Sequence, residues 1–175
     1  SGRTLQTMEI ILRECQQESI PYTRDKRIRE WCFGSLDGGY DGELFNGVLP
    51  RVFDKDMSKL SYQEMVEGIL QVDTAGWAET WEELSGRIWA GFTAIAEKIT
   101  ADGGGNAIVV SHGMTIGTFL WLIDHRTPRG LGLDNGSVST VTFENGEFRI
   151  EGIGDVGYRL KGRKILEERN NAKES

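Results

Sequence analysis

The most regular pattern of apolar positions along the chain begins just after Glu79. Apolar side chains recur there at steps of three and four residues, at Trp81, Leu84, Ile88, Phe92, Ile95 and Ile99. This spacing lines them along one face of a helix, so it predicts a long amphipathic helix packed against a core. The stretch TADGGGN, residues 100–106, ends the pattern, because glycine supplies the backbone conformations that a helix exit requires.

The residues before this helix show weaker patterns. GRTLQTMEIILRECQQ, residues 2–17, has near-helical apolar spacing and predicts an amphipathic helix. IPYTRDKRIREW, residues 20–31, is too charged for a core helix and suits an exposed strand or a loop. FGSLDGGYDGELFNG, residues 33–47, is dense in Gly, Asp and Asn and predicts a loop. Scattered apolar positions over 50–76 indicate short helices that form a cover.

After the long helix the pattern changes to that of a strand, a helix and a hairpin. AIVV, residues 107–110, is continuously apolar, as in a strand of a parallel sheet that is covered on both faces. TIGTFLWLI, residues 115–123, predicts a helix. The alternating residues on both sides of Asn145-Gly146 predict a β-hairpin. The polar residues 164–175 predict a frayed helix or a tail.

Length and composition limit the class of protein. The 175 residues, 38% of them hydrophobic and 27% charged, suit one globular domain with a substantial core. No apolar run approaches the ~20 residues of a membrane span, and no signal peptide is visible. Cys15 and Cys32 show no CxxC spacing and are expected as reduced, packed thiols, so we expect a cytoplasmic protein with no membrane partner.

The net charge also bears on the ligand. A formal charge of −7 argues against a nucleic-acid partner, because nucleic-acid modules are usually basic. It also means that any phosphate site must be built from a local cluster of positive groups.

His112 lies where the predicted strand stops and the next helix begins. Such junctions at the carboxyl edge of a parallel sheet are ligand sites in open α/β folds, and a helix amino terminus attracts anions. The imidazole of His112 can add charge or a hydrogen bond there, and Gly113 lets the backbone approach a ligand. The local pattern fits either a phosphate site or a histidine that merely packs at the turn.

Four stretches resemble the histidine phosphatase superfamily, also called the phosphoglycerate mutase-like family, in the order of that family. IVVSHGMTIG, residues 108–117, resembles its second histidine motif. SGRTLQT, IREWCFGSLDG and LDNGSVSTVTF resemble its second arginine segment, its catalytic-acid segment and its late strand. The resemblance covers nearly the whole chain. It implies a three-layer α/β/α fold with a mainly parallel sheet.

The resemblance also implies roles for individual residues. His112 and Glu30 become catalytic residues, with Glu30 as general acid and then base, and Asp37 as the rival for that role. Arg3 and Gly113 become substrate-binding residues for a small phosphorylated substrate. The scheme needs no metal and no cofactor, and the sequence shows no ligand cluster for a metal.

The resemblance leaves one gap. The family opens on a strand that ends in Arg-His-Gly, whose histidine becomes phosphorylated, and this triplet does not occur in the sequence. His125, in DHRTPRG, is expected to be a loop histidine. We therefore expect residues 1–165 to be a partial domain that lacks an N-terminal strand-helix unit. Within it, 38–76 would be an inserted lid or cover, and 166–175 a polar C-terminal tail.

Three functions follow from the resemblance. The first is a phosphomonoester hydrolase with a phosphohistidine mechanism, whose nucleophilic histidine is absent from this chain. The second is phosphoryl transfer of the phosphoglycerate mutase type. The third is an inactive fragment or a phosphate-ester binding module, and the missing N-terminal segment or a second copy of the chain would then be its partner.

Overall fold

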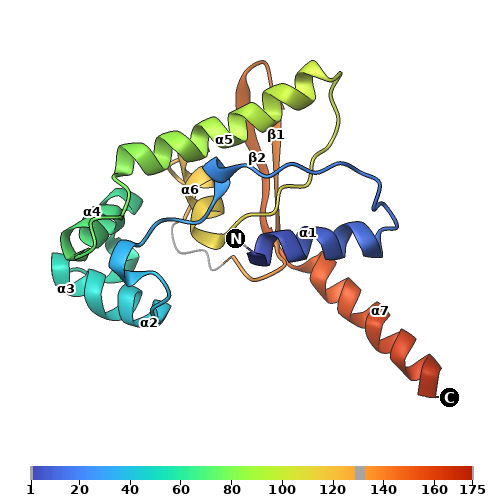
Figure 1. Ribbon diagram of the computed structural model, residues 1–175, viewed down its shortest axis with the longest axis horizontal. Coiled ribbons are helices and arrows are strands. Elements are labelled where there is room, and N and C mark those ends of the chain that lie inside the picture. Colours follow the sequence, from blue (N-terminus) through green and yellow to red (C-terminus); the bar gives the residue numbers. More distant parts are fainter. Residues whose placement is uncertain (1, 129–132, 175) are drawn as a thin grey trace.

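The computed structural model describes residues 2–128 and 133–174 (Figure 1). The longer elements are α1 (Gly2–Glu14), α4 (Tyr62–Val72), α5 (Trp81–Ala101), α6 (Gly113–Ile123), β1 (Val138–Glu144), β2 (Glu147–Asp155) and α7 (Gly157–Glu174). The shorter ones are α2 (Asp41–Glu43), the π-helix Leu44–Val48, α3 (Leu49–Phe53) and the 3-10 turns Lys26–Ile28, Gly34–Leu36 and Met57–Lys59. Among the described residues, no helix combines the length and the apolar character of a membrane span.

The long helix predicted after Glu79 is confirmed as α5. It begins in a capping box, in which the Glu83 amide donates to the Thr80 hydroxyl (3.2 Å) and the Thr80 amide donates to the Glu83 carboxylate (2.9 Å). These bonds satisfy amides that the first turn of a helix leaves without partners. Figure 1 shows α5 crossing the molecule, with α4 at one end and the hairpin near the other.

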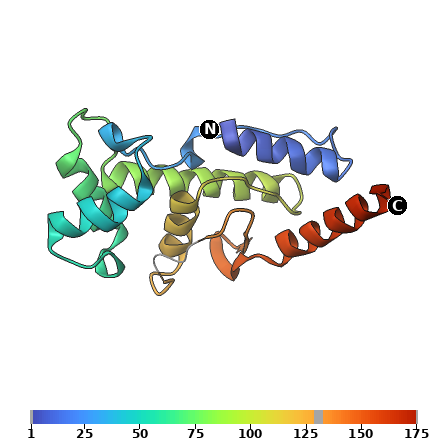
Figure 2. The same ribbon diagram turned by 90° about the horizontal axis from the view of Figure 1, so that it is seen from below.

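The two helices at the ends of the chain contribute little to the core. The N-terminal helix is confirmed as α1, but none of its residues is buried. The polar C-terminal stretch forms the end of α7, which projects from the rest of the chain (Figures 1 and 2). An exposed ion pair of 4.0 Å joins Arg169 of α7 to Glu14 of α1.

The loop predicted for residues 33–47 is wrong over its second half. Residues 41–53 run through α2, the π-helix and α3 without a break. Leu44 and Leu49 on this stretch are buried in the core, and that burial outweighs the local preference of Gly, Asp and Asn for turns. The short helices predicted over 50–76 are confirmed by α3, the turn Met57–Lys59 and α4.

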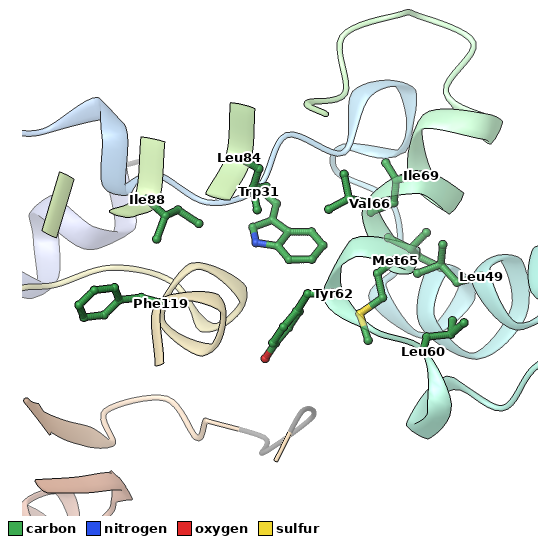
Figure 3. Packing of buried hydrophobic residues seen from close by; sticks show 11 residues of the cluster. Trp31, Leu49, Leu60, Tyr62, Met65, Val66, Ile69, Leu84, Ile88 and Phe119 are labelled. Atoms are coloured by element: carbon green, nitrogen blue, oxygen red, sulfur yellow. The ribbon is translucent and has the colours of Figure 1, made fainter. Parts of the chain in front are cut away.

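Two aromatic residues join the two halves of the apolar core. In Figure 3, Trp31 and Tyr62 lie between Ile88 and Phe119 on one side and the side chains of α3 and α4 on the other. Their rings meet edge to face with centroids 5.9 Å apart. The indole N–H of Trp31 donates to the Thr118 hydroxyl on α6 (3.2 Å), so this side chain, 3% exposed, fixes its segment against α6.

The sheet of the described residues is two-stranded and antiparallel, in place of the mainly parallel sheet expected. β1 and β2 pair across Asn145-Gly146, both with positive φ, which confirms the predicted hairpin. The strand predicted for residues 107–110 does not form among the described residues: these residues have no regular secondary structure and pair with no described strand, and Ile108 is 67% exposed. Residues 107–110 therefore have the composition of a strand, but no described strand lies beside them for pairing.

Gly34 packs closely against Asp73, and so joins the segment that follows Glu30 to the loop before α5. Its φ is +61°, and a Cβ atom there would overlap the carboxylate of Asp73. That carboxylate accepts the amides of Ser35, Ala75, Trp77 and Ala78 at 2.7–2.9 Å. Backbone donors, with that of Ala78 first, hold the pKa of Asp73 well below its usual range. Only glycine allows this approach.

We predict that Gly34→Ala lowers the free energy of unfolding by about 3 kcal/mol. The alanine side chain would overlap the Asp73 carboxylate, and its backbone would also be strained in the left-handed conformation. Gly38→Ala is the matched control, since its φ is +81° and its added Cβ would have no neighbour within 4 Å. The control should lose only the backbone contribution, about 1 kcal/mol. Urea unfolding of both variants measures the two losses of stability. Equal losses would show that the contact between Gly34 and Asp73 is not tightly packed.

Candidate active site

Three parts of the chain meet at the amino terminus of α6. Arg3 lies on the first turn of α1, Glu30 follows the turn Lys26–Ile28, and His112 occupies the N-cap position of α6. The charges of Arg3 and Glu30 both act on the His112 imidazole. The structure therefore places Arg3 and Glu30 within electrostatic reach of His112, although Arg3 and His112 lie 109 positions apart in the sequence (112 minus 3).

Glu30 caps α6 from another part of the chain. Its Oε1 accepts the amide of Thr115 (3.1 Å) and the Thr115 hydroxyl (3.0 Å), and its Oε2 accepts the amide of Met114 at 3.4 Å. The amide of Trp31 also donates to Oε1, at 3.0 Å. A carboxylate at this position satisfies free helix amides and lies at the positive end of the helix dipole. The half-buried Glu30 side chain is thereby held beside His112.

His112 is a half-buried histidine with an unused nitrogen. Its backbone is extended (φ −121°, ψ 158°), and its carbonyl accepts the Ile116 amide at 2.8 Å. Its Nε2 is buried and has no hydrogen-bond partner among the described residues. Burial lowers the pKa of His112 below its ordinary value; Glu30 opposes this shift and Arg3 adds to it. A buried ring nitrogen without a partner can accept or donate a bond to a ligand.

Arg3 and Gly113, the predicted substrate-binding residues, are both exposed. Arg3 is exposed, and no side-chain partner of its guanidinium is recorded among the described residues. A Cβ atom built on Gly113 would meet nothing within 4 Å, so the start of α6 is open on that side. Since Glu30 already uses the amides of Met114 and Thr115, the groups left for an anion are Arg3, His112 and the backbone at Gly113.

The remaining candidates of the sequence lie elsewhere. Asp37 is exposed, and its carboxylate accepts the amide of Phe33 in its own turn (3.3 Å). His125 is in the loop after α6, where its ring packs on Trp121 with centroids 4.1 Å apart. Both cysteines are free; Cys15 is exposed rather than packed, and Cys32 is half-buried. No cluster of three metal-ligating side chains occurs within the described residues.

Sequence reasoning missed the residues that hold Glu30 in place. Thr115, with no exposed surface, binds both the Glu30 carboxylate and the Arg29 carbonyl. Ser111 donates to the Ile28 carbonyl at 2.7 Å. Hydroxyl residues at the start of a helix usually cap their own helix, so nothing in the sequence indicated a distant partner.

We predict that Glu30→Gln lowers the pKa of His112 further, because it removes the negative charge that favours the imidazolium. Arg3→Ala should raise it, and Arg13→Ala, at the other end of α1, should leave it unchanged. NMR titration of the imidazole C–H signals, assigned with His125→Ala, measures all three. If the pKa of His112 is the same in Glu30→Gln as in the wild type, Glu30 does not lie close to His112.

The same shift has a consequence for stability. Because the folded-state pKa of His112 lies below the unfolded value of about 6.5, the unfolded chain takes up the proton first as the pH falls. This contribution to stability is complete above that pH and is lost as the pH falls through the folded-state pKa.

Comparisons with known proteins identify the family of the chain. The model of the histidine phosphatase superfamily (branch 1) matches residues 1–156. A crystal structure of phosphoglycerate mutase from Bacillus anthracis str. Sterne is similar, with 31% identity and a TM-score of 0.86 over 93% of this chain and 73% of that chain. No curated protein matches the chain. The structural match confirms the phosphoglycerate mutase-like α/β fold class, and the chain belongs to the histidine phosphatase superfamily.

Proposed function

We propose that this protein is a phosphomonoester hydrolase that acts through a phosphohistidine and without a metal. Membership of the superfamily and the mutase neighbour support phosphoryl transfer as the general function. The observation that carries the finer proposal is the Glu30 carboxylate bonded to the first amides of α6 beside His112, whose Nε2 is unpartnered among the described residues and whose imidazole feels the charge of Arg3. A cation and a free imidazole can stabilise the charge on the phosphoryl oxygens, and an acid can protonate the leaving oxygen.

Each residue has a defined part in the proposed reaction. A nucleophilic imidazole forms an N–P bond while the P–O bond to the leaving group breaks, and Glu30 gives its proton to the leaving oxygen. Water then attacks the phosphorus and gives a proton back to Glu30; the N–P bond breaks and phosphate leaves. Arg3 and His112 hold phosphoryl oxygens throughout, because the charge of the transition state spreads over those oxygens.

We place the nucleophilic imidazole on a strand beside residues 107–110. This segment has the apolar sequence of a strand, has no strand partner in the described part of the chain and exposes Ile108. A parallel strand paired with it would end at the same edge, next to His112. Such a strand, from a longer form of the chain, would bring the nucleophile to the groups around His112.

A mutase reaction is the second candidate, favoured by the similarity to the Bacillus anthracis phosphoglycerate mutase structure. A mutase would keep the phosphoryl group on the enzyme and return it to another hydroxyl. The groups around His112 serve both reactions equally, so the difference lies in whether water reaches the phosphohistidine.

We predict that the natural protein hydrolyses p-nitrophenyl phosphate in the presence of EDTA. His112→Ala should lower kcat/KM about 100-fold or more, because it removes one charge-stabilising group. His125→Ala, the other histidine of the sequence, is the matched control and should leave kcat/KM unchanged. A wild-type protein without turnover would indicate a binding module, and equal losses in both variants would remove the role of His112.

The two reactions are separated by following 3-phosphoglycerate with 31P NMR. A hydrolase is expected to release inorganic phosphate, because water is the acceptor. Conversion to 2-phosphoglycerate without release of phosphate would contradict the hydrolase proposal and support the mutase.

A further inference from the structure

A nearly buried ion pair lies behind the Glu30 segment and takes no part in the proposed reaction. Arg87 on α5 forms a two-bond contact with Glu79, from its Nε to Oε1 (2.6 Å) and from its Nη2 to Oε2 (2.7 Å). Each of the two side chains is only 11% exposed. Burial alone would raise the pKa of Glu79, but the bonds and charge of Arg87 hold that pKa below its usual range.

The remaining N–H groups of Arg87 bind the backbone around Glu30. Its Nη1 donates to the carbonyls of Arg27 and Arg29, both at 2.9 Å, and its Nη2 donates to the carbonyl of Glu30 at 3.0 Å. All five N–H groups of the guanidinium are therefore engaged. Glu79 in turn accepts the amide of Cys32 at 3.2 Å. The pair thus holds the main chain on both sides of Glu30.

The same segment is bound by α6 on its other side. Ser111 donates to the Ile28 carbonyl and Thr115 to the Arg29 carbonyl, both at 2.7 Å. Gly91 lets the segment approach α5, since a Cβ atom there would lie 2.8 Å from the Ile28 side chain. Side chains on α5 and α6 and just before each helix therefore take the place of a regular backbone ladder, and the position of Glu30 depends on them.

A gain in stability does not by itself explain why a buried Glu79–Arg87 pair is present. A buried ion pair loses the hydration of both charges, and apolar residues of similar size often stabilise a protein as well or better. An arginine with five fixed donors does what an apolar pair cannot, because it sets the direction of three carbonyls.

We infer that Glu79 and Arg87 are positioning residues that hold the Glu30 carboxylate at its place between α6 and His112. This inference rests on the proposed function for its effect on rate, and on the geometry alone for its effect on the position of Glu30.

The test is Arg87→Lys in the natural protein. Lysine keeps the positive charge but lacks the planar guanidinium with its five N–H donors. The carbonyls of Arg27, Arg29 and Glu30 would lose these donors, so we expect Glu30 to shift. We expect kcat for p-nitrophenyl phosphate to fall about 10- to 100-fold, with KM changed by less than about 2-fold. We also expect the pKa of His112 to move toward its value in Glu30→Gln, and Glu30→Gln to add little in the Arg87→Lys background.

Arg126→Lys is the matched control, because Arg126 pairs with Asp124 on the surface and its side chain is 91% exposed. This variant should change neither kcat nor the His112 pKa. If Arg87→Lys does not fold, Glu79→Gln, which keeps the shape of the side chain, is judged by the same measurements.

The outcomes separate the inference from the proposed function. An Arg87→Lys protein with wild-type kcat and an unchanged His112 pKa overturns the inference, and so does a fall in kcat without a change in that pKa. If the wild-type protein has no phosphatase activity, the proposed function fails. The His112 pKa in Arg87→Lys then decides the inference alone, with a shift supporting it and no shift overturning it.

Discussion

The contact between the Glu30 carboxylate and the first amides of α6 is the interaction on which the site depends. It joins a segment without regular structure to the helix that carries His112. A carboxylate at a helix amino terminus is stabilised by free N–H groups and by the helix dipole. The residue proposed as the acid of the reaction is therefore also part of the fold, so changes at Glu30 affect both.

This contact is supported by layers of polar bonds and an apolar anchor. Trp31, the neighbour of Glu30, fills the centre of the core and bonds to α6, and the Glu79–Arg87 pair holds the backbone from α5. An irregular segment must find partners for its carbonyls, and here buried side chains supply them. His112 differs from these residues, because its buried Nε2 lacks a hydrogen-bond partner among the described residues. The polar groups that hold Glu30 are thus hydrogen-bonded, whereas Nε2 of His112 is not bonded to any described residue.

Much of the fold was predictable because its signals are local. The apolar spacing of α5 and Asn145-Gly146 in the hairpin each act within a few residues. The errors arose where distant contacts prevailed. Leu44 and Leu49 draw a Gly- and Asp-rich stretch into helix by packing against the core, and residues 107–110 have the composition of a buried strand without a described neighbour.

The sequence by itself determined which residues were candidates, since motifs in the family order singled out Arg3, Glu30, His112 and Gly113. It also determined the chemistry these side chains can perform, because acidity, charge and hydrogen-bonding groups belong to residue types. Only the tertiary structure decided their proximity, the capping of α6 by Glu30 and the engagement of every N–H of Arg87. The hydrogen bonds among these contacts join residues up to 85 positions apart along the chain, and no local pattern of a sequence encodes such a distance.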